Sequence, residues 1–189
     1  WLALYESKSG ERSMFNRKAA DEQVAKNGRR QTGHMWGTNP CSEIILRPYQ
    51  FCNLSEVVVR ETDDLLSLRS KVRIATMLGT FQSTLTDLKY LRKIWKTNTE
   101  EERLLGVSLT GIIDHLVLAR NVDSKIWLQE MKQVAIDTNK EYADKIGIPR
   151  STAITCVKPS GTVSQLTDSA SGIHARHNPF YIRTVRGDN

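Results

Sequence analysis

The segment of residues 38–59, TNPCSEIILRPYQFCNLSEVVV, contains two cysteines and ends in a run of β-branched residues. Cys41 lies between Asn39 and Glu43, and Cys52 follows later in the segment. In a loop or an extended strand, side chains two positions apart project to the same side. The amide, the thiol and the carboxylate would then face one ligand, and the carboxylate could accept a proton from it. This arrangement predicts a reaction centre, against the alternative that Cys41 is a small buried apolar residue.

The residues around Cys41 predict its local structure. Gly33, Gly37 and Pro40 interrupt regular structure before the cysteine, which favours a loop. Residues 51–59 are rich in β-branched and apolar side chains and predict a strand with Cys52 near its start. Both cysteines are therefore expected near one end of a sheet, where α/β folds usually hold ligands.

The rest of the chain predicts helices that alternate with strands. Apolar spacing and end signals indicate a helix over 17–26, which Gly28 stops, and another over 65–91. A third helix is expected from Thr99 onward, carrying Leu104, Leu105 and Leu109. A fourth is expected over 127–142 and is closed by Gly147. Residues 153–157 and 180–185 predict further strands. Long helices between strands favour parallel pairing, so the pattern predicts an α/β fold.

A second motif follows the predicted strand 153–157. A turn containing glycine and hydroxyl side chains presents donors to an anion, particularly if a helix begins at Thr162. We therefore predict phosphate binding here, although the lysine precedes the glycine and the motif is not a Walker A loop. The predicted phosphate-binding residues are Pro159, Ser160, Gly161, Thr162 and Val163. Cys156, inside the strand, is interpreted as a packing residue.

Composition narrows the class of protein. The 189 residues are 39% hydrophobic and 25% charged, as is typical of a soluble globular domain, and no apolar run is long enough for a membrane span. The net charge of +6 suits a polyanionic ligand, but the basic residues are scattered, so we expect substrate steering and no direct nucleic-acid binding. Three cysteines do not form a disulfide framework and favour the reducing cytoplasm. The histidine spacing predicts no metal site.

These motifs resemble those of a known enzyme family. The N-x-C-x-E element at residues 39–43, followed by a second cysteine, resembles the active-site finger loop of ribonucleotide reductases, and KPSGTVS at 158–164 resembles their phosphate-binding loop. GERSMFNRKAA at 10–20 and GIHARH at 172–177 extend the likeness over almost the whole chain. NPCSE followed by CNLSEV is most similar to the adenosylcobalamin-dependent (class II) ribonucleoside-triphosphate reductases. Ser42 stands where glycine is common in related enzymes.

The resemblance implies a fold and a place in a longer chain. We expect the central part of a ten-stranded α/β barrel with the cysteine finger loop inside it. The chain opens without an initiator methionine and stops without a closing element. Residues 1–189 are therefore expected to be part of a catalytic barrel domain, an internal fragment whose N-terminal and C-terminal parts are absent and which is inactive alone.

The resemblance also implies a reaction, the reduction of ribonucleoside triphosphates to 2′-deoxyribonucleotides for DNA synthesis. Cys41 would become a thiyl radical generated with adenosylcobalamin and would abstract the ribose 3′-hydrogen. Glu43 would act as base on the 3′-hydroxyl, and Asn39 would orient the ribose hydroxyls. Cys52 would be one of two reducing thiols, with a partner upstream, and thioredoxin or a similar dithiol would restore them.

Two alternatives remain open from the sequence. One is the large subunit of a class I ribonucleoside-diphosphate reductase, in which a second protein delivers the radical. The other is a non-catalytic module that binds nucleotides or nucleic acid through its basic surface. The sequence does not separate a triphosphate from a diphosphate substrate, and it does not indicate allosteric regulation or oligomeric state.

Overall fold

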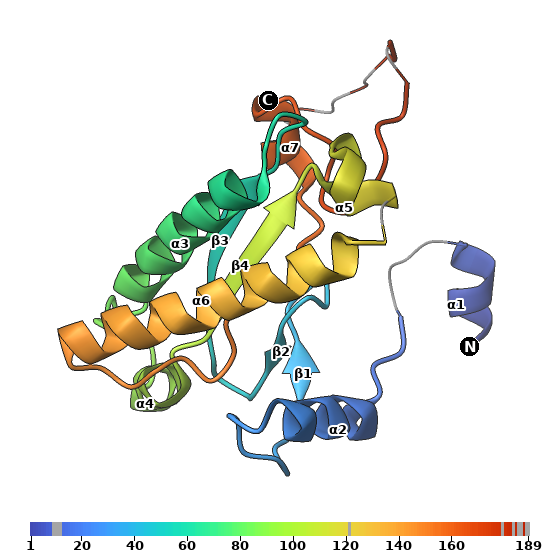
Figure 1. Ribbon diagram of the computed structural model, residues 1–189. Coiled ribbons are helices and arrows are strands. Elements are labelled where there is room, and N and C mark those ends of the chain that lie inside the picture. The colour runs from blue at the N-terminus through green and yellow to red at the C-terminus, as the bar shows by residue number, and fades with distance from the viewer. Residues whose placement is uncertain (9–12, 121, 179, 183, 185–186, 188–189) are drawn as a thin grey trace.

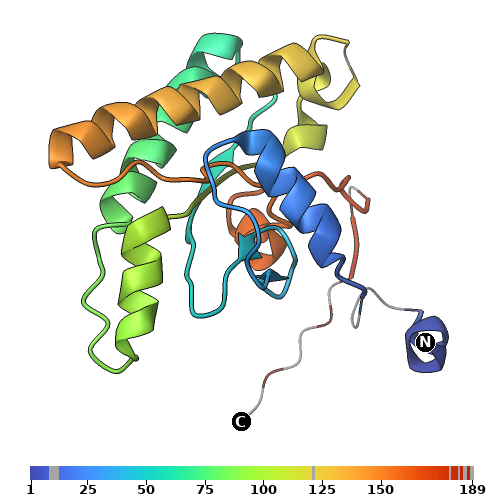
Figure 2. The ribbon, with the colours of Figure 1, turned by 90° about the horizontal axis from the view of Figure 1, so that it is seen from below.

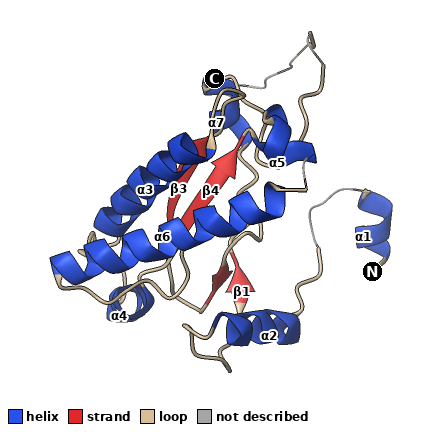
Figure 3. Ribbon diagram, viewed as in Figure 1, coloured by secondary structure: helices blue, strands red, loops and turns tan. Residues whose placement is uncertain are grey.

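The computed structural model describes residues 1–189 except 9–12, 121, 179, 183, 185–186 and 188–189. The structure mixes helices with two separate pairs of strands (Figure 3). Its elements in chain order are α1 (Leu2–Ser7), α2 (Arg17–Asn27), β1 (Gly37–Thr38), β2 (Ile45–Leu46), β3 (Asn53–Val58), α3 (Leu65–Gln82), α4 (Lys93–Glu102), β4 (Leu105–Thr110), the 3₁₀ helix η1 (Ile112–Asp114), α5 (Leu116–Arg120), α6 (Ser124–Ile146) and α7 (Gly161–Leu166).

Strand β4 is the centre of the fold. It pairs in parallel with β3, with Asn53 opposite Leu105. On its other side, Thr155 forms a parallel bridge to Val107, and Cys156 N donates to Val107 O at 3.0 Å. β4 is buried along nearly its whole length. The prediction of an α/β fold with parallel pairing is therefore confirmed, with β4 between β3 and the extended segment 153–156.

Helices α3 and α6 pack against each other and run in front of β3 and β4 in Figure 1. Asp64 and Ser67 form a reciprocal capping box that starts α3, because each side chain accepts from the other's backbone N–H. The apolar faces of these helices and the strands enclose the main core, which consists of Val57, Val59, Leu68, Val72, Ala75, Leu105, Val107, Leu118, Met131, Ala135 and Ile154. No helix in the described part of the chain is long and apolar enough to cross a membrane.

Helix α2 forms a second, smaller cluster with the β1–β2 pair. Ala20, Val24 and Trp36 are buried together against Ile45. Asn16 caps α2, and Gly28 ends it in a left-handed conformation, as the sequence predicts. In Figure 2, α3 and α6 lie together along the top, and α2 lies below them, next to the β1–β2 pair.

A buried charge network joins these two parts. The side chains of Arg30 and Glu102 are only 4% and 5% exposed, and they form an ion pair of 2.7 Å. Arg47 lies 3.3 Å from the same carboxylate, and the Gln50 amide also donates to it. Burial alone would raise the pKa of Glu102, but hydrogen bonds from Arg30 and Gln50 and the charges of both arginines outweigh burial and hold the pKa below its usual value.

The prediction of a helix starting at Thr99 is wrong. Thr99 lies near the end of α4, and the segment that contains Leu104, Leu105 and Leu109 leads into and forms β4. A central parallel strand is buried on both faces, so its sequence is a continuous apolar run rather than an alternating pattern. Hydrophobic periodicity does not separate such a run from a buried helix.

Two other predicted boundaries need correction. Helix α3 ends at Gln82 and not near Leu91, and the hydroxyls of Ser83 and Thr84 bond the carbonyls of its last turn. The predicted strand 180–185 lies partly outside the described residues, and its described members form no strand. Phe180 and Ile182 are 92% and 97% exposed, so no partner strand covers them.

We predict that Gly106→Ala destabilises the chain by about 1–3 kcal/mol, the usual cost of overpacking. A Cβ at Gly106 would overlap Leu54 and would lie 3.2 Å from the sulfurs of both Cys52 and Cys156. Urea unfolding measures the change. Gly37→Ala is the control, because a Cβ there meets nothing within 4 Å. Equal stability of the two variants would contradict this packing.

We also predict that Glu102→Gln costs about 3–5 kcal/mol at pH 7, because it leaves the buried Arg30 without its counter-ion. The lowered pKa of Glu102 contributes stability above its usual pKa, and this contribution is lost as the pH falls through the folded value. The variant should therefore show a shallower loss of stability in acid. Glu141→Gln, which removes a partly exposed partner of Arg73 and Lys145, should change urea stability little and serves as the control.

Candidate functional site

The cysteine loop follows β1 as a tight turn. Ser42 N donates to Asn39 O at 3.0 Å, and the Asn39 side-chain oxygen accepts from Ile44 N at 3.0 Å. Ser42 has a φ of 61°, the left-handed conformation that glycine adopts most readily. Cys41 is consequently exposed at the tip of the turn. The loop prediction is confirmed, and the alternative of a buried apolar Cys41 is excluded.

Glu43 is the buried member of this turn. Its side chain is 1% exposed, and its carboxylate lies 2.8 Å from the Lys158 ammonium, which belongs to the second motif. Neither carboxylate oxygen has a hydrogen bond of good geometry among the described residues, so the ion pair with Lys158 is the contact that neutralises the carboxylate. Burial by itself would raise the pKa of Glu43, but Lys158 and the polar groups of the turn, including Asn39, hold it below the usual range.

Two thiols flank Gly106 beside this carboxylate. The sulfurs of Cys52 and Cys156 each lie 3.2 Å from the position that a Cβ on Gly106 would take, so they are no farther apart than twice that distance. Burial, reinforced by the charge of Glu43, raises the pKa of each thiol to about 12. Both thiols are therefore protonated near neutral pH.

The two thiols do not have the geometry of a disulfide. Cys52 precedes β3 and Cys156 lies on the other side of β4, so two strand spacings of roughly 4.8 Å each separate their backbones. A disulfide requires Cα atoms about 4.4–6.8 Å apart. Cys52 therefore keeps its thiol available for a different partner.

The predicted phosphate turn leads directly into α7. Ser160 is the residue before the helix, and it is 3% exposed. Its backbone oxygen accepts from the hydroxyls of Ser164 and Ser171, whereas its own Oγ has no partner among the described residues. Gly161, Thr162 and Val163 are exposed at the start of the helix. The turn thus presents backbone donors to solvent next to a buried hydroxyl.

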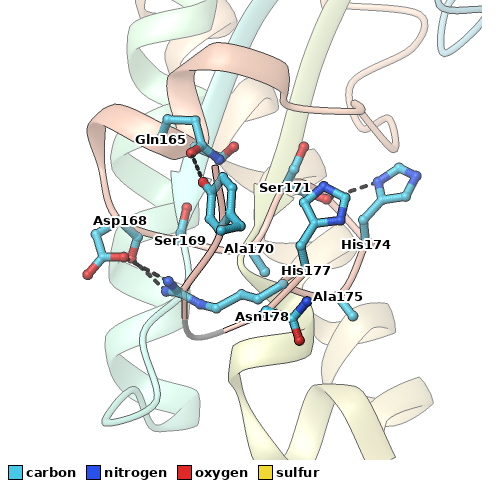
Figure 4. Close-up of a pocket in the computed structure, with 12 residues that line it drawn as sticks. Gln165, Asp168, Ser169, Ala170, Ser171, His174, Ala175, His177 and Asn178 are labelled. Atoms are coloured by element: carbon cyan, nitrogen blue, oxygen red, sulfur yellow. Dashed lines mark hydrogen bonds and ion pairs between the residues drawn. The ribbon is translucent and has the colours of Figure 1, made fainter. Parts of the chain in front are cut away.

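The loop after α7 lines a cavity of about 680 Å³ (Figure 4). Arg176 fixes this loop, because its guanidinium donates to Asp114 at 3.0 Å and to Asp168 at 2.7 Å. The Tyr181 hydroxyl donates to Gln165 Oε1 at 2.6 Å. The cavity shares Ser164 and Ser171 with the surroundings of the phosphate turn, and Cys41 is not among its lining residues. In the described part of the chain no group of three His, Cys, Asp or Glu residues is arranged for a metal ion.

The structure brings together residues that are far apart in the sequence. Asn39, Lys158 and Cys52 are gathered around Glu43, and Cys41 lies close enough to Lys158 to raise the Lys158 pKa. Cys41 occupies the exposed end of this group and Cys52 the partly buried end. Sequence reasoning missed Lys158 as the partner of Glu43 and missed the proximity of Cys156 to Cys52. No local signal reports either contact, because both depend on segment 153–158 lying beside β4.

We predict that Ser42→Val is less stable than Ser42→Gly by about 1–2 kcal/mol, because a β-branched residue is strained at this φ. Both variants lose the Ser42 hydroxyl, which lies 3.3 Å from that of Thr38. The difference in stability between them therefore reports the backbone conformation at residue 42. Thermal or urea unfolding measures it. Identical stabilities would show that the turn does not hold residue 42 in the left-handed conformation.

Comparisons with known proteins agree with the resemblance in the motifs. No family model matches the chain. It is 27% identical over 218 residues to the adenosylcobalamin-dependent ribonucleoside-triphosphate reductase of Lacticaseibacillus paracasei, covering 98% of this chain and 28% of that protein. It is 26% identical over 153 residues to the enzyme of that name from Euglena gracilis, covering 79% of this chain and 20% of that protein. The chain thus spans less than a third of the length of these relatives.

A solved structure supports the same comparison. A crystal structure of a B12-dependent (class II) ribonucleotide reductase superposes with a TM-score of 0.61 at 24% identity, over 73% of this chain and 22% of that one. At this identity the superposition establishes the fold alone. The chain therefore resembles the adenosylcobalamin-dependent ribonucleoside-triphosphate reductases in sequence over most of its length, and it shares its fold with part of a class II ribonucleotide reductase.

Proposed function

We propose that this chain carries the cysteine loop and the phosphate turn of an enzyme that reduces ribonucleoside triphosphates to 2′-deoxyribonucleotides with adenosylcobalamin. The observation that carries the proposal is the contact between the two motifs. The 2.8 Å ion pair of Glu43 with Lys158 sets the turn of residues 39–43 beside the turn of residues 158–163. A sugar next to Cys41 and its phosphates next to Ser160 would then belong to one bound nucleotide.

The cysteine loop has the geometry for the first half of the reaction. The exposed Cys41 fits a radical that arrives from outside this chain, and adenosylcobalamin supplies such a radical when bound. The Cys41 thiyl takes the ribose 3′-hydrogen, Glu43 accepts the proton of the 3′-hydroxyl, and Asn39 orients the ribose hydroxyls. Positioning is critical in such a step, because a displacement of about 1 Å can cost 10²-fold in rate.

Cys52 serves the second half as a reducing thiol. Its pKa of about 12 keeps it protonated, so it carries the hydrogen that the 2′ position needs. Two thiols lose two electrons and two protons, the 2′-hydroxyl leaves as water, and a disulfide forms. Cys41 then returns the abstracted hydrogen to the 3′ carbon and is a thiyl radical again. Cys156 is not the second thiol, because β4 separates the two backbones. The second thiol comes from outside residues 1–189, and thioredoxin or a similar dithiol reduces the disulfide.

The phosphate turn holds the other end of the substrate. Backbone N–H groups of Ser160, Gly161, Thr162 and Val163 bind phosphate oxygens, and the ring of Pro159 limits the freedom of the turn. The buried Ser160 hydroxyl, which has no partner among the described residues, supports this assignment because a bound oxygen would satisfy it.

The superposition on the class II structure supports a place for these residues within a larger barrel. β3, β4 and segment 153–156 would be three strands of a ten-stranded barrel, with the Cys41 turn inside it. Residues 1–189 would be part of a cytoplasmic catalytic domain. A class I diphosphate reductase would place the same thiols similarly, whereas a binding module without catalysis gives no reason for an exposed thiol beside a buried carboxylate.

We predict that Cys41→Ser in the full-length protein abolishes deoxyribonucleotide formation with adenosylcobalamin and a dithiol, while nucleotide binding persists. Cys156→Ser is the matched control and should keep turnover, because Cys156 takes no part in the reaction. Product formation is measured by chromatography and nucleotide binding by calorimetry. Normal turnover by Cys41→Ser would refute the proposal, and activity only with a second radical-generating protein would favour the class I alternative.

A further inference from the structure

The partner of Glu43 belongs to the phosphate turn itself. The Glu43 side chain is 1% exposed and that of Lys158 is 28% exposed, so the ion pair joins a buried acid to a lysine that solvent still reaches. Lys158 lies two positions before Ser160, at the beginning of the turn that would bind phosphates. The residue that begins the proposed phosphate turn is therefore the one whose ammonium pairs with the proposed base.

The other ionisable groups near Glu43 are either bound to other residues or uncharged. Arg30 shares a cavity of about 190 Å³ with Glu43, but its guanidinium is bound to Glu102, Gln50 and Ile45 O. The thiols of Cys52 and Cys156 face the carboxylate and are uncharged near neutral pH. Among the described residues, Lys158 is therefore the cation that responds directly to the charge of Glu43.

Resting on the proposed function, we propose that Lys158 is a positioning residue with two alternative partners. It pairs with Glu43 while the phosphate turn is empty, and it transfers part of its contacts to the substrate's phosphates when a nucleotide binds. Binding of the nucleotide thereby releases Glu43 to accept the proton of the 3′-hydroxyl.

Electrostatics explains why this exchange helps the reaction. Burial would raise the pKa of Glu43, but the hydrogen bond and the charge of Lys158, together with the polar groups of the turn, keep it low, which makes the carboxylate a weak base. A phosphate group is a stronger competitor for an ammonium than a single carboxylate, because it carries more charge and more acceptor oxygens. As Lys158 turns toward phosphate, the pKa of Glu43 rises and its basicity increases. The base is then strongest once a substrate is in place.

The test is a titration of Glu43 in the full-length protein by carboxyl-carbon NMR with labelled glutamate. The Glu43 signal is assigned by its loss in Glu43→Gln. We expect a low midpoint in the unmodified chain, and an upward shift when inorganic tripolyphosphate is added. Lys158→Met should raise the midpoint without tripolyphosphate and abolish most of the added shift, whereas Lys158→Arg should retain the low midpoint.

Lys145→Met is the matched control, because it removes the exposed pair of Lys145 with Glu141 on α6 and should leave the Glu43 midpoint unchanged. A Glu43 midpoint that is the same in Lys158→Met and in the unmodified chain would overturn the inference. So would a midpoint that ignores tripolyphosphate in the unmodified chain. The titration requires no turnover, so its failure is distinguishable from failure of the Cys41→Ser assay.

Discussion

The burial of β4 between β3 and segment 153–156 is the constraint on which the rest of the structure depends. Parallel strands satisfy their backbone groups only with neighbours on both sides, and β4 has β3 on one side and Thr155 on the other. This placement carries segment 153–158 across the fold to the cysteine loop. It brings Lys158 to Glu43, and it separates Cys52 from Cys156 by the width of a strand. The chemistry of the site thus follows from the order of three extended segments.

The polar interactions fall into two groups with different roles. The network of Glu102 with Arg30, Arg47 and Gln50 is almost wholly buried and holds the β1–β2 region against α4. The pair of Glu43 with Lys158 has one partly exposed member and lies between two turns. A buried network with every charge paired is rigid, whereas a pair open to solvent on one side can exchange partners. The first group suits a scaffold and the second suits a site that responds to a ligand.

Local sequence signals predicted much of the fold. Gly28 ends α2, Gly147 ends α6, and the β-branched run after Cys52 forms β3. These signals succeed because caps and strand propensity act over a few residues. They fail at β4, where burial on both faces removes the alternation that distinguishes a strand from a helix.

The sequence by itself determined the chemical identity of the candidate site: a cysteine between an amide and a carboxylate, a second cysteine, and a glycine turn with hydroxyl groups. It also indicated that Cys41 lies on a loop, because Gly37 and Pro40 act locally. Only the tertiary structure decided that Lys158 neutralises Glu43, that Cys156 lies beside Cys52 without the geometry of a disulfide, and that Ser42 adopts a left-handed conformation. Those contacts arise from the pairing of distant segments, and the free energy of such pairing depends on the whole core rather than on neighbouring residues.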